Sequence, residues 1–356
     1  MSRIGRVLQM MEQENLDAIL VADRYNVRYI SCFTGDTAYL YISQKRRILM
    51  TDSRYTTWAR SEVRDFEIIQ TDRTNSYQDQ LSRLLEEEQI SCIGFENRKM
   101  LYSDVVQFQK RAENVRWQEL EGRLDALRQI KDQTEREYIA QAERIGDQAF
   151  AQVIKEVSAG MTELELAWEL ETNMRRAGAQ GLSFETIAVF GERTAMPHAV
   201  PGGRRLTAGD LIVMDFGCIY EGYCSDMTRT VVLGKADRQQ QKIYETVLEA
   251  QLKALSTIRA GLKASDVDAA ARQVIEEAGY GDYFGHGLGH SVGLAIHESP
   301  ALAPKDHHIL QEYMLETIEP GIYIPDFGGV RIEDLVIIRE NGCDNLTHSP
   351  KELLEL

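Results

Sequence analysis

The stretch LIVMDFGCIYEGYCSDMTRTVVL, residues 211–233, contains two β-rich runs on either side of Glu221-Gly222, a pair that predicts a tight hairpin turn. With these two residues as the loop, Asp226 lies opposite Gly217, and Asp215 lies on the same face as Gly217. Diagonal neighbours on one face are about 7 Å apart, so both carboxylates are able to bracket metal ions about 3.5–4 Å apart. The alternative is that both aspartates are solvated at a hairpin end.

Two glutamates further along the chain have a similar local pattern. LETIEPGIYIP, residues 315–325, predicts a strand that ends at Glu319 before a Pro320-Gly321 turn. GGVRIEDLVII, residues 328–338, places Glu333 inside a strongly β sequence. A carboxylate inside a buried strand is costly unless it is paired or binds a cation. The alternative is an edge strand in which Arg331 is the counterion of Glu333.

A histidine-rich segment, GHGLGHSVGLAIHESP, residues 285–300, lies between these two carboxylate pairs. Together with Phe284 it matches the pattern F-x-H-x-x-G-H-x-x-G-L-x-x-H-E-x-P. The metal-ligand types then follow the order Asp, Asp, His, Glu, Glu. This order and this pattern resemble the pita-bread metallopeptidases, and within them the Xaa-Pro branch that contains Xaa-Pro dipeptidase (prolidase) and aminopeptidase P. Ser291 stands where the family usually has glycine, which is the one departure within the pattern.

The resemblance implies a role for each of the matched residues. The implied metal ligands are Asp215, Asp226, His290, Glu319 and Glu333. The implied catalytic residues are His198 (in MPHAVP), His297 and Glu319, and the residues that line the proline side of the pocket are His286, Tyr323 and Arg331.

The resemblance also implies the fold, which is of the α+β class: a C-terminal pita-bread catalytic domain, residues 128–356, and a smaller N-terminal creatinase-like α/β domain, residues 1–127. The length of the chain, which is independent of the motifs, agrees with two domains, because 356 residues are about twice a typical domain. In the N-terminal part, DAILVA, TAYLYIS, RRILMTD and EIIQT are typical of strands, and residues 4–11 and 76–88 of helices. Residues 127–157 indicate a long helix that Gly160 ends, and Thr162-x-x-Glu165 is a capping box for the next.

Composition excludes several other classes of protein. The net charge is −16, and the acidic excess lies almost wholly after residue 128. The negative electrostatic field of this part repels nucleic acid. No apolar run approaches the roughly 20 residues needed to cross a bilayer, and no signal-peptide stretch precedes the first domain, so we expect a cytoplasmic protein without a membrane partner. The five cysteines lack CxxC spacing and indicate neither a disulfide framework nor a zinc ribbon.

As an expectation from the resemblance, the protein hydrolyses Xaa-Pro bonds of proline-containing peptides or dipeptides by a hydroxide that bridges two divalent ions. One imidazole and four carboxylates favour Mn²⁺, with Co²⁺ or Zn²⁺ as alternatives. The resemblance further implies a homodimer. Dipeptidase and aminopeptidase P specificity stay open, as do methionine aminopeptidase-like specificity and a non-catalytic peptide- or partner-binding protein on the same fold.

Overall fold

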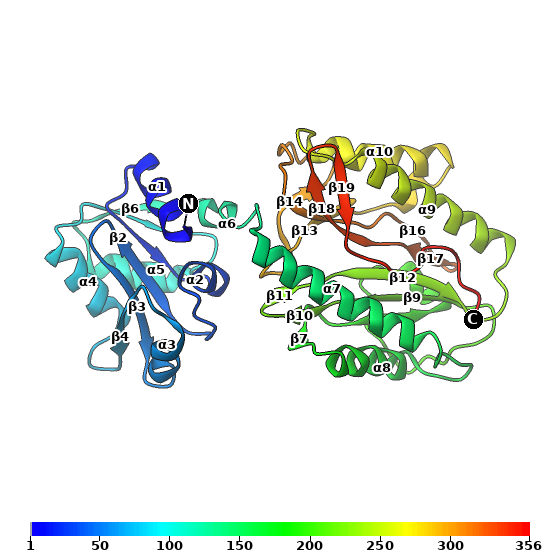
Figure 1. Cartoon of the computed structure of the whole chain (residues 1–356), viewed down its shortest axis with the longest axis horizontal. Coiled ribbons are helices and arrows are strands. Elements are labelled where there is room, and N and C mark those ends of the chain that lie inside the picture. Colours follow the sequence, from blue (N-terminus) through cyan, green and yellow to red (C-terminus); the bar gives the residue numbers. More distant parts are fainter. Residues whose placement is uncertain (1) are drawn as a thin grey trace. The chain divides into compact units, whose positions relative to one another are not determined.

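The computed structural model describes residues 2–356 and divides the chain into two compact units, one reaching to Arg128 and the other extending from Gln129 to Leu356 (Figure 1). The first unit has its core around one sheet, and the second has two large clusters of buried apolar residues. In the chain from residue 2 onward, no helix is both long and apolar enough to span a membrane.

The first unit is built on one mixed sheet of six strands in the order β4-β3-β2-β1-β5-β6. Its strands are β1 (Ala18–Val21), β2 (Tyr39–Ser43), β3 (Arg47–Asp52), β4 (Glu67–Thr71), β5 (Cys92–Phe95) and β6 (Arg116–Glu119). Its helices are α1 (Arg3–Gln13), α2 (Arg24–Ser31), α3 (Thr56–Glu62), α4 (Tyr77–Glu87), α5 (Tyr102–Arg111) and α6 (Arg123–Ala126). The four predicted strands and both predicted helices of this unit are therefore confirmed.

The second unit contains four long helices and many short strands. The helices are α7 (Gln133–Val153), α8 (Glu163–Arg176), α9 (Arg238–Thr257) and α10 (Ala264–Glu277), with 3-10 turns η1 (Gly191–Ala195) and η2 (Gly281–Tyr283). The strands are β7 (Gly181–Leu182), β8 (Ile187–Phe190), β9 (Leu211–Phe216), β10 (Cys218–Tyr220), β11 (Tyr223–Cys224), β12 (Met227–Val232), β13 (Gly289–Ser291), β14 (Glu298–Leu302), β15 (Leu315–Ile318), β16 (Gly321–Ile324), β17 (Gly328–Arg331), β18 (Asp334–Arg339) and β19 (Gly342–Asn345).

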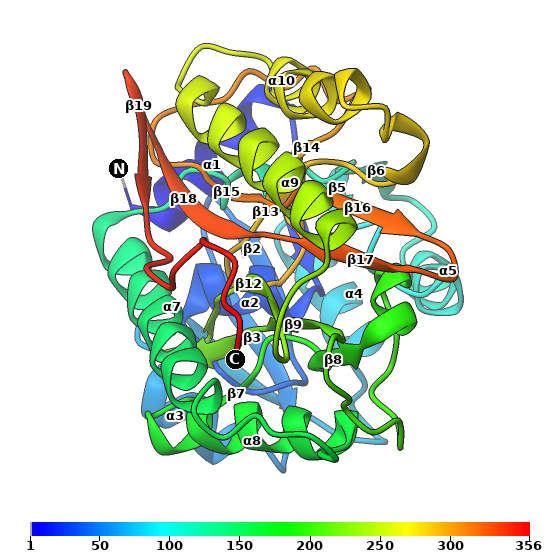
Figure 2. The ribbon, with the colours of Figure 1, turned by 90° about the vertical axis from the view of Figure 1, so that its right-hand side faces the viewer.

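Two helix pairs enclose the strands of this unit (Figure 2). The pair α9 and α10 buries its apolar side against residues of β16, β17 and β18, as in the cluster that joins Val247, Ile275 and Val330. The pair α7 and α8 packs in the same way on β8, β9 and β12, where Phe150 and Leu170 share a cluster with other buried residues. The strands between the two pairs are the ones that carry the acidic and histidine motifs.

The long helix of this unit differs from the prediction at both ends. It begins at Gln133 because Asp132 and Glu135 form a reciprocal capping box, which fixes the first turn. It ends at Val153, and Gly160, with φ of 89°, lies in the turn that leads to α8, so the prediction that Gly160 ends α7 is wrong. The predicted capping box of Thr162 and Glu165 at the start of α8 is confirmed.

Candidate metal centre and active site

The hairpin that contains both aspartates folds as its sequence predicts. Glu221 and Gly222 both have positive φ, 48° and 80°, as a two-residue type I′ turn requires. Phe216 pairs with Met227 on one side of these two positions, and Ile219 pairs with Cys224 on the turn side. The register is therefore continuous and places Gly217 opposite Asp226. A Cβ at position 217 would overlap the carbonyl oxygen of Ser225, which explains the glycine.

Asp215 and Asp226 point to one cavity but have different partners. Asp226 is 4% exposed and approaches His290, with 3.4 Å between its Oδ2 and the histidine Nε2. Asp215 accepts a hydrogen bond from Nη2 of Arg331 at 2.6 Å through its Oδ2. Its Oδ1 is buried and has no hydrogen-bond partner among residues 2–356. The counterion role that the sequence left open for Arg331 is therefore filled by Asp215 and not by Glu333.

His290 lies on β13, which is held close to β15. A Cβ at Gly289 would overlap the backbone carbonyl of Thr317, and the backbone N–H of His290 donates to Oγ1 of Thr317 at 3.0 Å. Nδ1 of His290 lies 3.2 Å from the carbonyl oxygen of Ser291. Because a carbonyl only accepts, Nδ1 carries the proton and Nε2 presents a lone pair to the cavity, as a metal ligand does.

The two glutamates lie at strand ends. Glu319 directly follows β15, and its Oε1 accepts from the Thr317 hydroxyl at 3.1 Å and lies 3.6 Å from Nε2 of His290. Glu333 lies between β17 and β18, so the prediction that it lies inside a strand is wrong. The chain changes partner there, because β17 pairs with β16 and β18 with β15. The backbone N–H of Glu333 instead donates to the carbonyl of Thr228 at 3.1 Å.

The five predicted ligands line one cavity of about 450 Å³. One ligand atom from each of Asp226, His290 and Glu333 lies within 4.8 Å of the other two, which is the spacing of a metal-binding set. Asp215 and Glu319 complete the acidic wall. Tyr323 is the one predicted site residue that is not in the cavity lining.

The carboxylates of this wall are arranged as if a cation belonged between them. Burial, and then the charge of Glu333, raises the pKa of Asp226 well above its ordinary range. Burial also raises the pKa of Glu319 to about 8, against the opposing charge of Arg331. Crowded buried carboxylates repel one another, and a divalent cation removes that cost. With the unpartnered Oδ1 of Asp215, these residues fit a hard divalent ion.

Three histidines of the site, His286, His290 and His297, are neutral at neutral pH. Burial, and then the charge of Arg331, lowers the pKa of His286 to about 4, and burial followed by His297 lowers that of His290 to about 4. The pKa of His297 is lowered by burial and then by His198. The ring of His297 lies 4.5 Å from that of His290, and His198 lines the same cavity. The N–H groups of His286 and His290 are directed to backbone carbonyls, so the neutral ring of His297 is the one whose N–H suits hydrogen bonding to a substrate.

Tyr323 connects His286 to Arg331 behind the cavity wall. Nδ1 of His286 lies 2.8 Å from the carbonyl of Gly287 and so carries the proton, which leaves Nε2 to accept from the Tyr323 hydroxyl at 2.9 Å. The tyrosine oxygen accepts in turn from Nη1 of Arg331 at 2.9 Å. Both nitrogens of His286 are therefore occupied within the protein.

Four residues that support the site were missed by the sequence analysis. Thr228 lies two positions after Asp226, and Thr317 lies two positions before Glu319, a spacing that indicates a shared face in extended chain. Glu143 is a fully buried carboxylate on the apolar side of α7, and its Oε2 lies 3.3 Å from the backbone nitrogen of Asp226. Glu163 begins α8 and accepts from the backbone N–H groups of Phe190 and Gly202, on either side of His198.

Models of two known protein families match the two units of the chain. The model of metallopeptidase family M24 matches residues 137–340, and the model of the creatinase/prolidase N-terminal domain matches residues 3–130. The Xaa-Pro dipeptidase of Pyrococcus horikoshii is 36% identical over 362 residues, which cover 99% of this chain and 98% of the relative.

Two solved structures superpose over nearly the whole chain. An Xaa-Pro dipeptidase from Bacillus anthracis has a TM-score of 0.96 at 38% identity and 99% coverage of both chains. An X-Pro aminopeptidase from Thermotoga maritima has a TM-score of 0.93 at 37% identity and full coverage of both. These matches confirm the predicted fold class, a pita-bread domain that follows a smaller creatinase-like α/β domain.

Proposed function

The chain belongs to metallopeptidase family M24, and from this premise we propose that it cleaves the peptide bond before proline in short peptides. Similar chains with dipeptidase and aminopeptidase names support this substrate class. The observation that carries the proposal is the set of Asp226, His290 and Glu333, whose ligand atoms lie within 4.8 Å of one another at one cavity.

We assign two divalent ions to this cavity, held by Asp215, Asp226, His290, Glu319 and Glu333. When bound, such ions polarise the scissile carbonyl and lower the pKa of a water molecule toward neutrality. Four carboxylates and one imidazole are hard or borderline ligands, which favours Mn²⁺ over softer ions, with Co²⁺ and Zn²⁺ as substitutes.

The side chains around the metal site have separate roles in the reaction. Glu319 accepts the proton of the attacking water, because its carboxylate lines the cavity beside the other metal ligands. His198 and His297 line the same cavity and donate hydrogen bonds to the carbonyl oxygen, where negative charge develops, or assist the transfer of the proton from Glu319 to the leaving nitrogen.

The cavity also suits the proline side of the bond. An Xaa-Pro bond is a tertiary amide without an N–H, so its recognition rests on shape and on the carbonyl. Phe184, Ile187 and Ile296 supply apolar wall to the cavity, which suits a pyrrolidine ring. Arg331 lines the cavity as a cation and suits the carboxylate of a terminal proline.

The test is hydrolysis of an Xaa-Pro dipeptide and an Xaa-Pro-Yaa tripeptide by metal-stripped protein, with and without Mn²⁺. We expect Mn²⁺-dependent release of the first residue. Cleavage of the dipeptide alone identifies a dipeptidase, and cleavage of the tripeptide an aminopeptidase P. If neither is cleaved with Mn²⁺, Co²⁺ or Zn²⁺, the proposal is wrong and a non-catalytic binding protein is favoured. Sedimentation of the same sample tests the homodimer that the family resemblance implies.

A further inference from the structure

Arg229 is a buried cation on the strand that carries Asp226, and the proposed reaction does not use it. It is 1% exposed and lies on the opposite face of β12 from Thr228. Its Nη1 donates to the carbonyl oxygens of Thr228 at 2.9 Å and Glu333 at 2.5 Å. Its Nη2 donates to Oδ1 of Asp334 and the carbonyl of Ser349, both at 2.8 Å, and its Nε donates to the carbonyl of Pro350 at 3.1 Å. All five N–H groups of the guanidinium thus have an acceptor.

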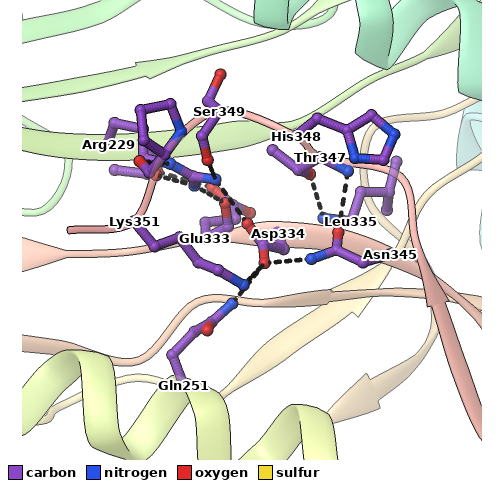
Figure 3. Close-up of polar contacts among 12 residues, drawn as sticks. Arg229, Gln251, Glu333, Asp334, Leu335, Asn345, Thr347, His348, Ser349 and Lys351 are labelled. Carbon is purple, nitrogen blue, oxygen red and sulfur yellow. Dashed lines mark hydrogen bonds and ion pairs between the residues drawn. The ribbon is translucent and has the colours of Figure 1, made fainter.

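Asp334 directly follows Glu333 and is fully buried at the start of β18. Its Oδ2 accepts from side chains of three separate segments, namely Gln251 on α9 at 2.8 Å, Asn345 on β19 at 2.6 Å and Lys351 near the C-terminus at 2.6 Å (Figure 3). Arg229 therefore binds both the carbonyl of Glu333 and the carboxylate of the next residue. This arrangement fixes the peptide that joins Glu333 to Asp334, and with it the direction of the Glu333 side chain.

Residues 347–351, which we call the C-terminal clamp, hold this arrangement from behind. Ser349 and Pro350 supply two of the five acceptors of Arg229. Asp147 on α7 anchors the clamp by accepting from the backbone N–H and the hydroxyl of Ser349. Tyr244 on α9 donates to the carbonyl of Lys351 at 2.9 Å. The clamp is thus tied to both helix pairs of the unit.

The same clamp reaches Asp226 by a second route. The Thr347 hydroxyl donates to Oε1 of Glu143 at 2.6 Å, and its oxygen accepts from the backbone N–H of Leu335 at 2.9 Å. The other oxygen of Glu143 accepts from the backbone N–H of Asp226 at 3.3 Å. One short segment therefore supports the backbone beside both Glu333 and Asp226.

We propose that Arg229, Asp334 and the C-terminal clamp are positioning residues for the metal ligands Glu333 and Asp226. They act from the face of β12 turned away from the cavity, and none of them lines it. The inference rests on the proposed function, in which Glu333 and Asp226 bind metal. It predicts that metal affinity depends on groups that never touch the ion. A purely structural role predicts lower stability with unchanged metal affinity.

The test is the binding of Mn²⁺ alone to metal-stripped protein, measured by titration calorimetry, with the visible absorption of bound Co²⁺ as a signature of ligand geometry. Asp334→Asn keeps the shape of the side chain but weakens its bond to Arg229. We expect about 10–100-fold weaker Mn²⁺ binding at one site or both, as for other changes behind a metal ligand, and an altered Co²⁺ spectrum. Lys351→Met removes one donor from a partly exposed position, and we expect a smaller loss in the same direction.

Asp344→Asn is the matched control, because Asp344 forms an ion pair with Arg339 on the exposed side of β19. We expect it to bind Mn²⁺ like the wild type. A folded Asp334→Asn protein with wild-type affinity and Co²⁺ spectrum overturns the inference. If Asp334→Asn does not fold, wild-type affinity in Lys351→Met overturns it instead. If the wild type binds neither Mn²⁺ nor Co²⁺, the proposed function itself fails.

Discussion

The hydroxyl of Thr228 donates to Oε2 of Glu333 across 2.7 Å. Since its one proton is committed to the glutamate, the same oxygen accepts from Nε of Arg331, which lies 3.0 Å away. Arg331 in turn donates to Asp215 through Nη2. A single threonine thus links the arginine that pairs with one predicted ligand to the carboxylate of another, and it fixes how that carboxylate faces the cavity.

Replacing Thr228 with valine preserves the shape of the side chain but removes this link. We expect Mn²⁺ affinity to fall by about tenfold or more, because Glu333 loses its orienting donor. We also expect the free energy of unfolding of the metal-free protein to fall by about 1–3 kcal/mol, because Nε of Arg331 keeps its burial without an acceptor. Calorimetric titration and urea unfolding measure the two effects. Thr246→Val, which removes a hydroxyl from α9, is the control and should leave Mn²⁺ affinity unchanged.

Glu163 anchors the loop that carries His198. Its carboxylate is fully buried and accepts from the backbone N–H of Phe190 at 3.1 Å, from that of Gly202 at 2.8 Å and from Nε of Arg193 at 3.0 Å. Arg193 extends the anchor by donating to the carbonyl of Val200 at 2.7 Å. Both ends of the segment 190–202 are therefore tied to the first turn of α8.

Glu163→Gln should displace His198 without touching the metal ligands. An amide has one acceptor oxygen in place of two, so part of the anchor is lost. We expect kcat to fall by up to about 100-fold, the loss that a displacement of about 1 Å produces, with Mn²⁺ affinity unchanged. The control is Glu165→Gln in the same turn, since glutamine also completes a capping box. Equal kcat for both variants would show that the anchor does not position His198.

Local pattern explains why much of this site was predictable. The hairpin of residues 211–233 needs only strand period and a turn pair, and both are local, so the opposition of Gly217 and Asp226 followed from the sequence. The family resemblance, which rests on the order of the ligand types, implied five metal ligands, and these five residues line one cavity. The capping box at Thr162 and Glu165 is local as well and was equally readable.

The parts that sequence did not predict depend on partners far along the chain. Arg331 donates a hydrogen bond to Asp215, which is 116 residues away in the sequence, and not to its neighbour Glu333. Glu333 lies in a break because the strands before and after it pair with different partners, a choice made by the packing of the whole unit. Strand period cannot distinguish one long run from two short strands that change sheet.

The metal-free protein should lose stability as pH rises. Burial raises the pKa of Glu319 from its ordinary value of 4.5 to about 8, so the folded state retains a proton that the unfolded state releases. The contribution of protonated Glu319 to the free energy of unfolding is complete below about pH 4.5 and is lost as pH rises through about 8. The free energy of unfolding falls by an amount on the order of a few kcal/mol across this range.

Urea unfolding of chelator-treated protein between pH 5 and pH 9 measures this loss. Saturating Mn²⁺ should reverse it at the alkaline end, because a ligand at about 100 times its dissociation constant stabilises the folded state by about 2.7 kcal/mol. Metal-free stability that stays level across this range would contradict the raised pKa of Glu319. Identical curves with and without Mn²⁺ would contradict the metal site as well.

A variant of Tyr323 tests how support of the cavity wall affects substrate binding. It lies behind the wall, where its hydroxyl accepts from Arg331 and donates to His286. We expect Tyr323→Phe to raise KM for an Xaa-Pro dipeptide by about fivefold, since Arg331 loses a partner worth about 1 kcal/mol, while kcat and Mn²⁺ affinity change little. Tyr313→Phe is the control, because it keeps the ring that Arg136 contacts at 4.1 Å. A fall in kcat with unchanged KM would instead place Tyr323 in the chemical step.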